Sequence, residues 1–315
     1  MGGGGESNLQ FFKVVLMIIV DNRMTYYPSY TSTKERNAMK QVLYFPLTRI
    51  VIGAAVCWLA LLGANSVLRV VIKSEGNLFR VIRWLLSTGV MVAAYILLFR
   101  HYENRAITEL SGTGLVRDGL VGLFAGALCI GVIIAILYAL GYYRILSTNS
   151  ALTLILTLLF FTTLSFFEEL VFRGIVFRIA EESLGTNLAL IISALIFGLA
   201  HIPNEHANTI SVISAAAGGV LAGLLFSMTK QLWLPIFFHA GWNWTQLALG
   251  AVVSGMEDMG EISSFVEANL EGPELLTGGV FGPENSIITI VFVLILSGVA
   301  YFLTMKSGNL IPRPF

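Results

Sequence analysis

The stretch "ALTLILTLLFFTTLSFFEELVFR", residues 151–173, joins a long apolar run to two adjacent acids and an arginine. The run can cross a membrane as a helix, since a span needs roughly 20 mostly apolar residues. Each ionised side chain near the centre of such a helix costs about 2.5–3.5 kcal/mol on insertion scales. Glu168, Glu169 and Arg173 therefore need compensation, which marks this stretch as a candidate functional site.

The composition of the whole chain indicates a polytopic membrane protein. Of its 315 residues, 56% are hydrophobic and 12% are charged, too few to cover a soluble globule of this size. The predicted partner of such an apolar chain is the lipid bilayer. The net charge is zero and the basic residues are scattered, so nucleic acid is not a predicted partner. Cys57 and Cys129 lie inside apolar runs, which favours packing residues over a disulfide framework.

Apolar runs of spanning length predict an all-α, polytopic transmembrane bundle of about eight helices. Charged or turn-forming residues bound each run. The runs lie at about 50–72, 81–100, 118–141, 151–179, 188–202, 210–228, 232–253 and 286–305. The fifth run is short, so we expect a neighbouring helix to shield its ends.

This layout divides the chain into four segments. Residues 1–49 are predicted to be a cytoplasmic or interfacial segment, and residues 50–149 hold the N-terminal transmembrane helices. Residues 150–250 form a core that carries the buried polar residues. Residues 251–315 are predicted to contain an acidic outside loop, the last transmembrane helix and a short tail.

The basic residues predict that both termini lie in the cytoplasm, because Lys and Arg accumulate in short cytoplasmic loops. The residues that follow this rule are Lys34, Arg36, Lys40, Arg49, Arg100, Arg105, Arg117, Lys230, Lys306 and Arg313. Residues 254–285 contain acids and no Lys or Arg, as an outside loop can. The basic loop near residue 75 disagrees, because Lys73, Arg80 and Arg83 would lie outside. In a prokaryote, the membrane would be the plasma membrane.

Six ionisable or amide residues lie deep in the fourth to seventh runs. They are Glu168, Glu169, Arg173, His201, His239 and Asn243. Glu169 and Arg173 are spaced i, i+4 and can pair on one helix face, although a purely structural ion pair would have the same spacing. Glu168 is rotated by about 100° from Glu169, so it must face another polar group or water.

The two histidines lie on different helices from these acids. His239 and Asn243 are also spaced i, i+4, so one helix presents an imidazole and an amide to the same side. At about 1.5 Å per residue, Glu168, His201 and His239 lie at comparable depths in their helices. We therefore expect a single polar cavity, which with this orientation would open towards the cytoplasm.

Three motifs in order resemble a known family. "EELVFR" at 168–173, "FGLAH" at 197–201 and "HAGWN" at 239–243 are similar to the motifs of the CPBP family of intramembrane proteases. CPBP stands for CAAX protease and bacteriocin-processing. The family is also called Abi and includes the Ras-converting CAAX endopeptidase. The resemblance covers residues 150–250. It implies an intramembrane endopeptidase that cleaves a membrane-associated peptide or protein, with or without a prenyl group.

The resemblance also implies roles for the site residues. Glu168 with His201 would hold and deprotonate a water molecule, while His239 and Asn243 would donate hydrogen bonds to the oxyanion. Glu169 and Arg173 would support the site, and no cofactor is favoured.

Two alternatives remain open at the level of sequence. Zinc held by Glu168, His201 and His239 would give a metalloprotease, although the H-E-x-x-H motif is absent. A proton- or ion-coupled transporter, from a different functional class, would also bury such residues. Transporters usually contain inverted repeats, and residues 50–141 contain no matching second set of polar residues.

Overall fold

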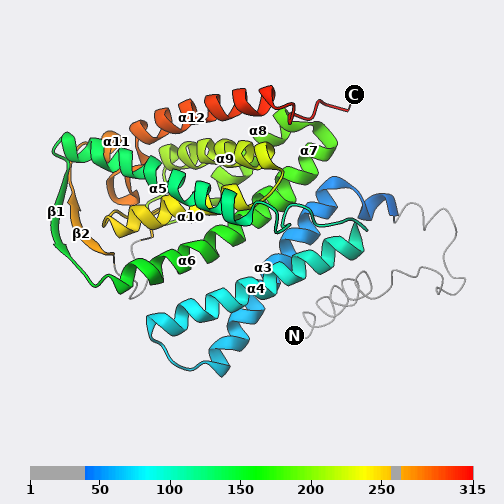
Figure 1. The fold of residues 1–315 in the computed structure, drawn as a ribbon, viewed down its shortest axis with the longest axis horizontal. Helices are drawn as coiled ribbons and strands as arrows, with labels where there is room; N and C mark the ends of the chain where they lie inside the picture. The colour runs from blue at the N-terminus through cyan, green and yellow to red at the C-terminus, as the bar shows by residue number, and fades with distance from the viewer. Residues whose placement is uncertain (1–39, 257–263, 315) are drawn as a thin grey trace, which may run out of the picture.

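The computed structural model describes residues 40–256 and 264–314, which form a bundle of helices with one small sheet at its end (Figure 1). Six of the described helices are long and apolar enough to cross a membrane. The predicted interfacial segment lies outside the described residues as far as residue 39, and so do Lys34 and Arg36.

The helices coincide with the eight predicted runs, which confirms the all-α polytopic bundle. The helices that match these runs are α3 (Pro46–Val71), α4 (Asn77–Tyr102), α5 (Leu115–Ala139), α6 (Leu152–Glu169), α8 (Thr186–Ala200), α9 (Thr209–Thr229), α10 (Trp233–Ala248) and α12 (Ile287–Lys306). A π-helical segment, η1 (Leu170–Phe177), connects α6 to α7 (Arg178–Leu184), so the fourth span is continuous.

A two-stranded antiparallel sheet is the element that the sequence analysis missed. Strand β1 (Tyr143–Thr148) follows α5 and pairs with β2 (Val266–Leu270), which lies in the predicted acidic loop. After β2 come the short helix α11 (Glu274–Thr277) and the 3-10 helices η2 (Gly279–Phe281) and η3 (Pro283–Asn285). From residue 264 onwards, the predicted loop is therefore an ordered cap that the sheet ties to α5.

Small residues allow the helices of the core to approach closely. A Cβ atom on Gly126 of α5 would lie 2.0 Å from the carbonyl oxygen of Phe238, and one on Gly241 of α10 would lie 2.2 Å from that of Leu123. Backbone contacts of this kind require glycine, as in other membrane helix pairs. Gly219 of α9 makes a similar approach to Ala194 of α8, which supplies the neighbour that the short fifth helix needs.

Ionic contacts gather at one end of the bundle, which we call the basic end. It comprises Arg49, the loop 103–114, the corner 184–186, the turn 229–232 and the tail 307–314. At this end Arg49 pairs with Glu182 at 2.8 Å, and Lys230 pairs with Glu181 at 3.0 Å. The opposite end carries β1, β2 and the residues 249–256 and 264–286 around them, and we call it the sheet end (Figure 1).

The structure accounts for part of the basic loop near residue 75. Arg83 is buried, and its Nη1 donates to the carbonyl oxygens of Ile72 at 3.1 Å and Ser74 at 2.6 Å. These carbonyls follow the end of α3, where unpaired oxygens attract a cation. Arg83 therefore satisfies a helix end, and its charge is compensated inside the protein.

Candidate active site

A buried ion pair lies at the junction of α6 and the π-helical segment. Nη1 of Arg173 lies 3.0 Å from Oε1 of Glu169, and both residues are fully buried. The guanidinium also donates to the carbonyl oxygen of Gly219 at 3.1 Å and lies 4.5 Å from the ring centre of Phe197. The predicted pairing is confirmed. π-Helical turns within α-helices occur frequently at functional sites, which fits this position.

His239 connects α10 to the same acid. Its Nδ1 donates to Oε1 of Glu169 at 2.9 Å, and its Nε2 lies 3.9 Å from Oε2 of Glu168. The imidazole therefore lies between two carboxylates from α6. Nδ1 carries the proton of the bond to Glu169, and Nε2 faces Glu168, so a proton on Nε2 would make that nitrogen a donor as well.

The two acids have different surroundings from those that the sequence analysis expected. Glu169, predicted to support the site through Arg173, also contacts His239. Glu168, predicted to act with His201, lies closest to His239 among the interactions of the described chain. Oε2 of Glu168 is buried and has no hydrogen-bond partner among the described residues. That oxygen needs a hydrogen-bond partner, which the described residues do not supply.

His201 follows the last residue of α8 and has a defined tautomer. Its Nδ1 lies 2.8 Å from the carbonyl oxygen of Phe197. Since a carbonyl oxygen only accepts, Nδ1 must carry the proton, and Nε2 of the neutral ring keeps its lone pair. His201 can therefore act as a base through Nε2.

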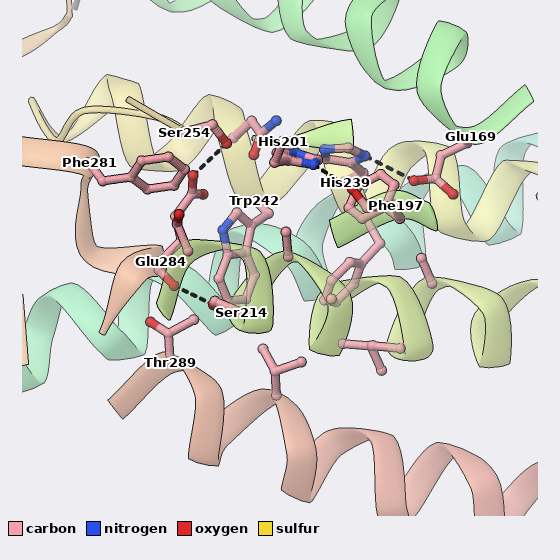
Figure 2. Close-up of a pocket in the computed structure, with 18 of the residues that line it drawn as sticks. Glu169, Phe197, His201, Ser214, His239, Trp242, Ser254, Phe281, Glu284 and Thr289 are labelled. Atoms are coloured by element: carbon pink, nitrogen blue, oxygen red, sulfur yellow. Dashed lines mark hydrogen bonds and ion pairs between the residues drawn. The ribbon is translucent and has the colours of Figure 1, made fainter. Parts of the chain in front are cut away.

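One cavity brings most of the predicted residues together (Figure 2). Its volume is about 100 Å³. The site residues in its lining are Glu169, Arg173, His201, His239 and Asn243, together with Ser211, Ser214, Trp242, Ser254, Phe281, Glu284 and Thr289. Glu168 does not line this cavity and reaches the site through His239.

The start of α9 is fixed next to this cavity. Oδ1 of Asn208 accepts from the backbone amides of Ile210 at 2.9 Å and Ser211 at 3.0 Å. In return, Oγ of Ser211 accepts from the amide of Asn208 at 2.8 Å, which completes a capping box. The cap leaves the first turn of α9 rigid, and this turn forms part of the cavity wall.

The cavity lies towards the sheet end of the bundle. Its lining includes Ser254, Phe281 and Glu284, all from the residues around β2, and His201 at the sheet end of α8. Those basic residues that predict cytoplasmic termini and that the structure describes lie at the opposite end. With the basic end in the cytoplasm, this cavity would lie nearer the outer surface than the sequence analysis expected, because His201 lies at the last residues of its helix, close to the opposite surface. The side on which the cavity opens stays a prediction.

Glu284 is the site residue that sequence reasoning missed. It lies in a loop with several acids, where nothing in the local pattern separates a buried carboxylate from a solvated one. Ser254 Oγ donates to its Oε1 at 2.5 Å, and Ser214 Oγ donates to its backbone carbonyl. The only sequence feature that could have indicated a buried Glu284 is its position just before the last apolar run.

The geometry also bears on a metal centre. Within residues 40–256 and 264–314, no group of three or more His, Cys, Asp or Glu side chains is placed to hold one metal ion. Glu168 and His239 come within 3.9 Å of each other, but the residues that the structure describes do not bring His201 to both. Zinc at this site remains a prediction that metal analysis can test.

Comparisons with known proteins agree with the family resemblance of the three motifs. Residues 149–245 match the family described as "Type II CAAX prenyl endopeptidase Rce1-like". A relative from Bacillus subtilis (strain 168), named "Putative membrane peptidase YdiL", is 29% identical over 114 residues. That match covers 36% of this chain and 41% of the relative, so the chain spans less than half of the relative's length. No solved structure shows a significant match.

Proposed function

We propose that this chain, whose residues 149–245 carry the Rce1-like domain of the CPBP family, is an intramembrane endopeptidase that needs no metal. The observation that carries the proposal is the meeting of His201, His239 and Asn243, from two helices, in one cavity beside the Glu169–Arg173 pair. Peptide hydrolysis requires an activated water, a base, donors for the oxyanion and access for water, and these groups can supply each role.

In the proposed reaction, Glu168 and His201 bind and deprotonate the water. Glu168 offers a buried oxygen with no partner in the described chain, and His201 offers the lone pair of Nε2. The hydroxide formed in this step attacks the carbonyl carbon of the scissile bond. The proton then passes to the leaving amine, so the base becomes the acid of the second step.

His239 and Asn243 stabilise the oxyanion in this proposal. The carboxylates of Glu168 and Glu169 favour a proton on Nε2 of His239, and Asn243 lies one turn further along α10 in the same cavity wall. Two fixed donors in a site with little water stabilise the developing charge without reorganisation. Arg173 keeps Glu169 ionised and holds it in place.

The substrate is proposed to be a membrane-associated peptide or protein. The direct test uses the full chain, purified in detergent, with a fluorogenic peptide library that contains prenylated and unprenylated members. We expect cleavage of a subset, and none by the Glu168→Ala variant. Failure of the wild-type protein to cleave any member would overturn the proposed activity.

Metal analysis of the same preparation separates the two hydrolytic mechanisms. We expect activity to survive a chelator and the active protein to contain far less than one zinc per chain. A zinc centre would predict about one ion per chain, loss of activity with chelation and recovery on adding zinc. That second result would replace the metal-free mechanism and leave the endopeptidase assignment intact.

A further inference from the structure

Glu284 contributes a third carboxylate to the cavity, and it comes from outside the matched domain at residues 149–245. Three contacts fix its position. Ser254 Oγ donates to its Oε1 at 2.5 Å, Ser214 Oγ donates to its backbone carbonyl, and Thr289 Oγ1 donates to the carbonyl oxygen of the preceding Pro283 at 2.7 Å. The carboxylate therefore occupies a set place in the wall, opposite the Glu169 end of the cavity (Figure 2).

No permanent cation of the cavity wall is free to neutralise this acid. Among the residues that line the cavity, Arg173 is the one Lys or Arg, and it is engaged with Glu169, Gly219 and the ring of Phe197. Burial raises the pKa of the Glu284 carboxyl, and the hydrogen bond from Ser254, which lowers it, offsets this rise only in part. The protein thus holds a poorly solvated acid next to its candidate catalytic groups.

A structural role explains this arrangement only in part. The bond from Ser254 could serve to join the residue 254 turn to η3. However, the backbone already ties this turn to the adjacent helix η2, since Gly255 N donates to the carbonyl oxygen of Phe281 at 2.9 Å. A buried carboxylate is a costly way to add one more bond, because desolvation of an ion costs several kcal/mol unless a partner compensates it.

We propose that Glu284 forms a subsite for a basic side chain of the substrate, a lysine or arginine close to the scissile bond. This inference rests on the proposed endopeptidase function. A peptide with its scissile carbonyl near His239 and Asn243 places a neighbouring side chain at the Glu284 end of the same cavity. The cation of that side chain then supplies a permanent charge beside Glu284, which no free Lys or Arg of the cavity wall supplies.

Paired peptides test the subsite. Each pair has lysine or its neutral, similarly sized analogue norleucine at one position within four residues of the scissile bond. We expect one position at which wild-type kcat/KM is roughly tenfold or more higher with lysine, since a buried charge pair is worth at least that much. In Glu284→Gln the ratio should fall towards one, and in Glu284→Lys a peptide with glutamate should become the better substrate.

A matched control and a binding measurement complete the design. Glu271→Gln removes an exposed acid that follows β2 and does not line the cavity, and it should keep the wild-type ratio. Anisotropy of the labelled pairs measures binding without turnover and so separates a failed subsite from a failed activity. Tighter binding of the lysine peptide that is lost in Glu284→Gln supports the proposal even without cleavage. Equal binding of both peptides to the wild type, or a preference that survives in Glu284→Gln, overturns it.

Discussion

The Nδ1 atom of His239 lies 2.9 Å from Oε1 of Glu169, an acid 70 residues earlier in the chain. The same oxygen lies 3.0 Å from Nη1 of Arg173. One carboxylate oxygen thus connects α6, η1 and α10, and it orients an imidazole while it compensates a buried guanidinium. Loss of this carboxylate disturbs two partners at once, whereas loss of the neighbouring acid, Glu168, removes a weaker contact at 3.9 Å.

Substitution of the two acids should have different consequences. Glu168→Gln is expected to lower kcat by about 10²–10⁴, the usual contribution of a general base, while the melting temperature stays close to that of the wild type. Glu169→Gln is expected to destabilise the fold by roughly 3–5 kcal/mol, because Arg173 remains buried without its counter-charge. Thermal unfolding and cleavage rates measured on the same samples check both. A Glu168→Gln enzyme with wild-type turnover would contradict the assignment of the base.

Asn243→Ala should act mainly on the transition state. If Asn243 donates to the oxyanion, kcat should fall by about 10²–10³ and KM should change little, since the bond strengthens as the charge develops. Steady-state kinetics on one cleaved peptide give both numbers. Gln246→Ala is a control on the same helix: its amide donates to the carbonyl oxygen of Val252, and its loss should lower stability more than kcat. A rise in KM with unchanged kcat in Asn243→Ala would show a role in substrate binding instead.

Gly126 should be essential for the position of His239. A Cβ there would come within 2.0 Å of the Phe238 carbonyl, so Gly126→Val must push α5 away from α10. We expect a marked loss of thermal stability and of activity. Gly131→Val is the matched control on the same helix, because a Cβ at Gly131 meets nothing within 4 Å. Equal stability of the two variants would contradict the close packing of these helices.

Stability should depend on Glu103, which lies at the basic end. Its carboxylate contacts Arg49 at 2.7 Å, Arg105 at 2.8 Å and Arg178 at 3.0 Å. Burial alone would raise the pKa of this carboxyl, but the arginines, Arg178 foremost, lower it overall. A lowered pKa means that the stabilisation is present above the ordinary value near 4.5 and is lost as the pH falls through the folded-state pKa.

Glu103→Gln should therefore lower the melting temperature at pH 7 and reduce the further loss that acidification causes. Melting curves between pH 7 and about pH 3 measure both effects. Glu75→Gln is the control, because the Glu75 side chain is 85% exposed and lies 3.8 Å from its arginine. If Glu103→Gln melted like the control at every pH, the network would contribute nothing to stability.

Thiol labelling should place the two ends of the bundle on opposite sides of the membrane. In a background without Cys57 and Cys129, Ser307→Cys marks the basic end and Glu271→Cys marks the sheet end. Because basic loops remain in the cytoplasm, an impermeant reagent applied from outside should label only the cysteine at 271. Labelling of that position from the cytoplasmic side would turn the cavity towards the cytoplasm and place the basic end outside.

The sequence by itself determined the elements of this protein and the pairs within one helix. Apolar runs of spanning length can be recognised locally, because a helix in lipid must satisfy its backbone hydrogen bonds within its own segment. All eight predicted runs are helices. The Glu169–Arg173 pair followed from the i, i+4 spacing alone. The three motifs indicated the family whose model matches residues 149–245, because they preserve order and residue type along the chain, which requires no coordinates.

Tertiary structure alone decided which groups meet across helices. Whether Glu168 or Glu169 contacts His239 depends on the rotation of α6 against α10. Close glycine contacts such as that of Gly126 fix α10 against α5, its neighbour on another side. The pairing of β1 with β2 joins segments more than a hundred residues apart. The entry of Glu284 into the cavity brings together residues from different elements. No local pattern encodes such contacts, because an acid in a polar loop looks the same whether it faces water or a buried cavity.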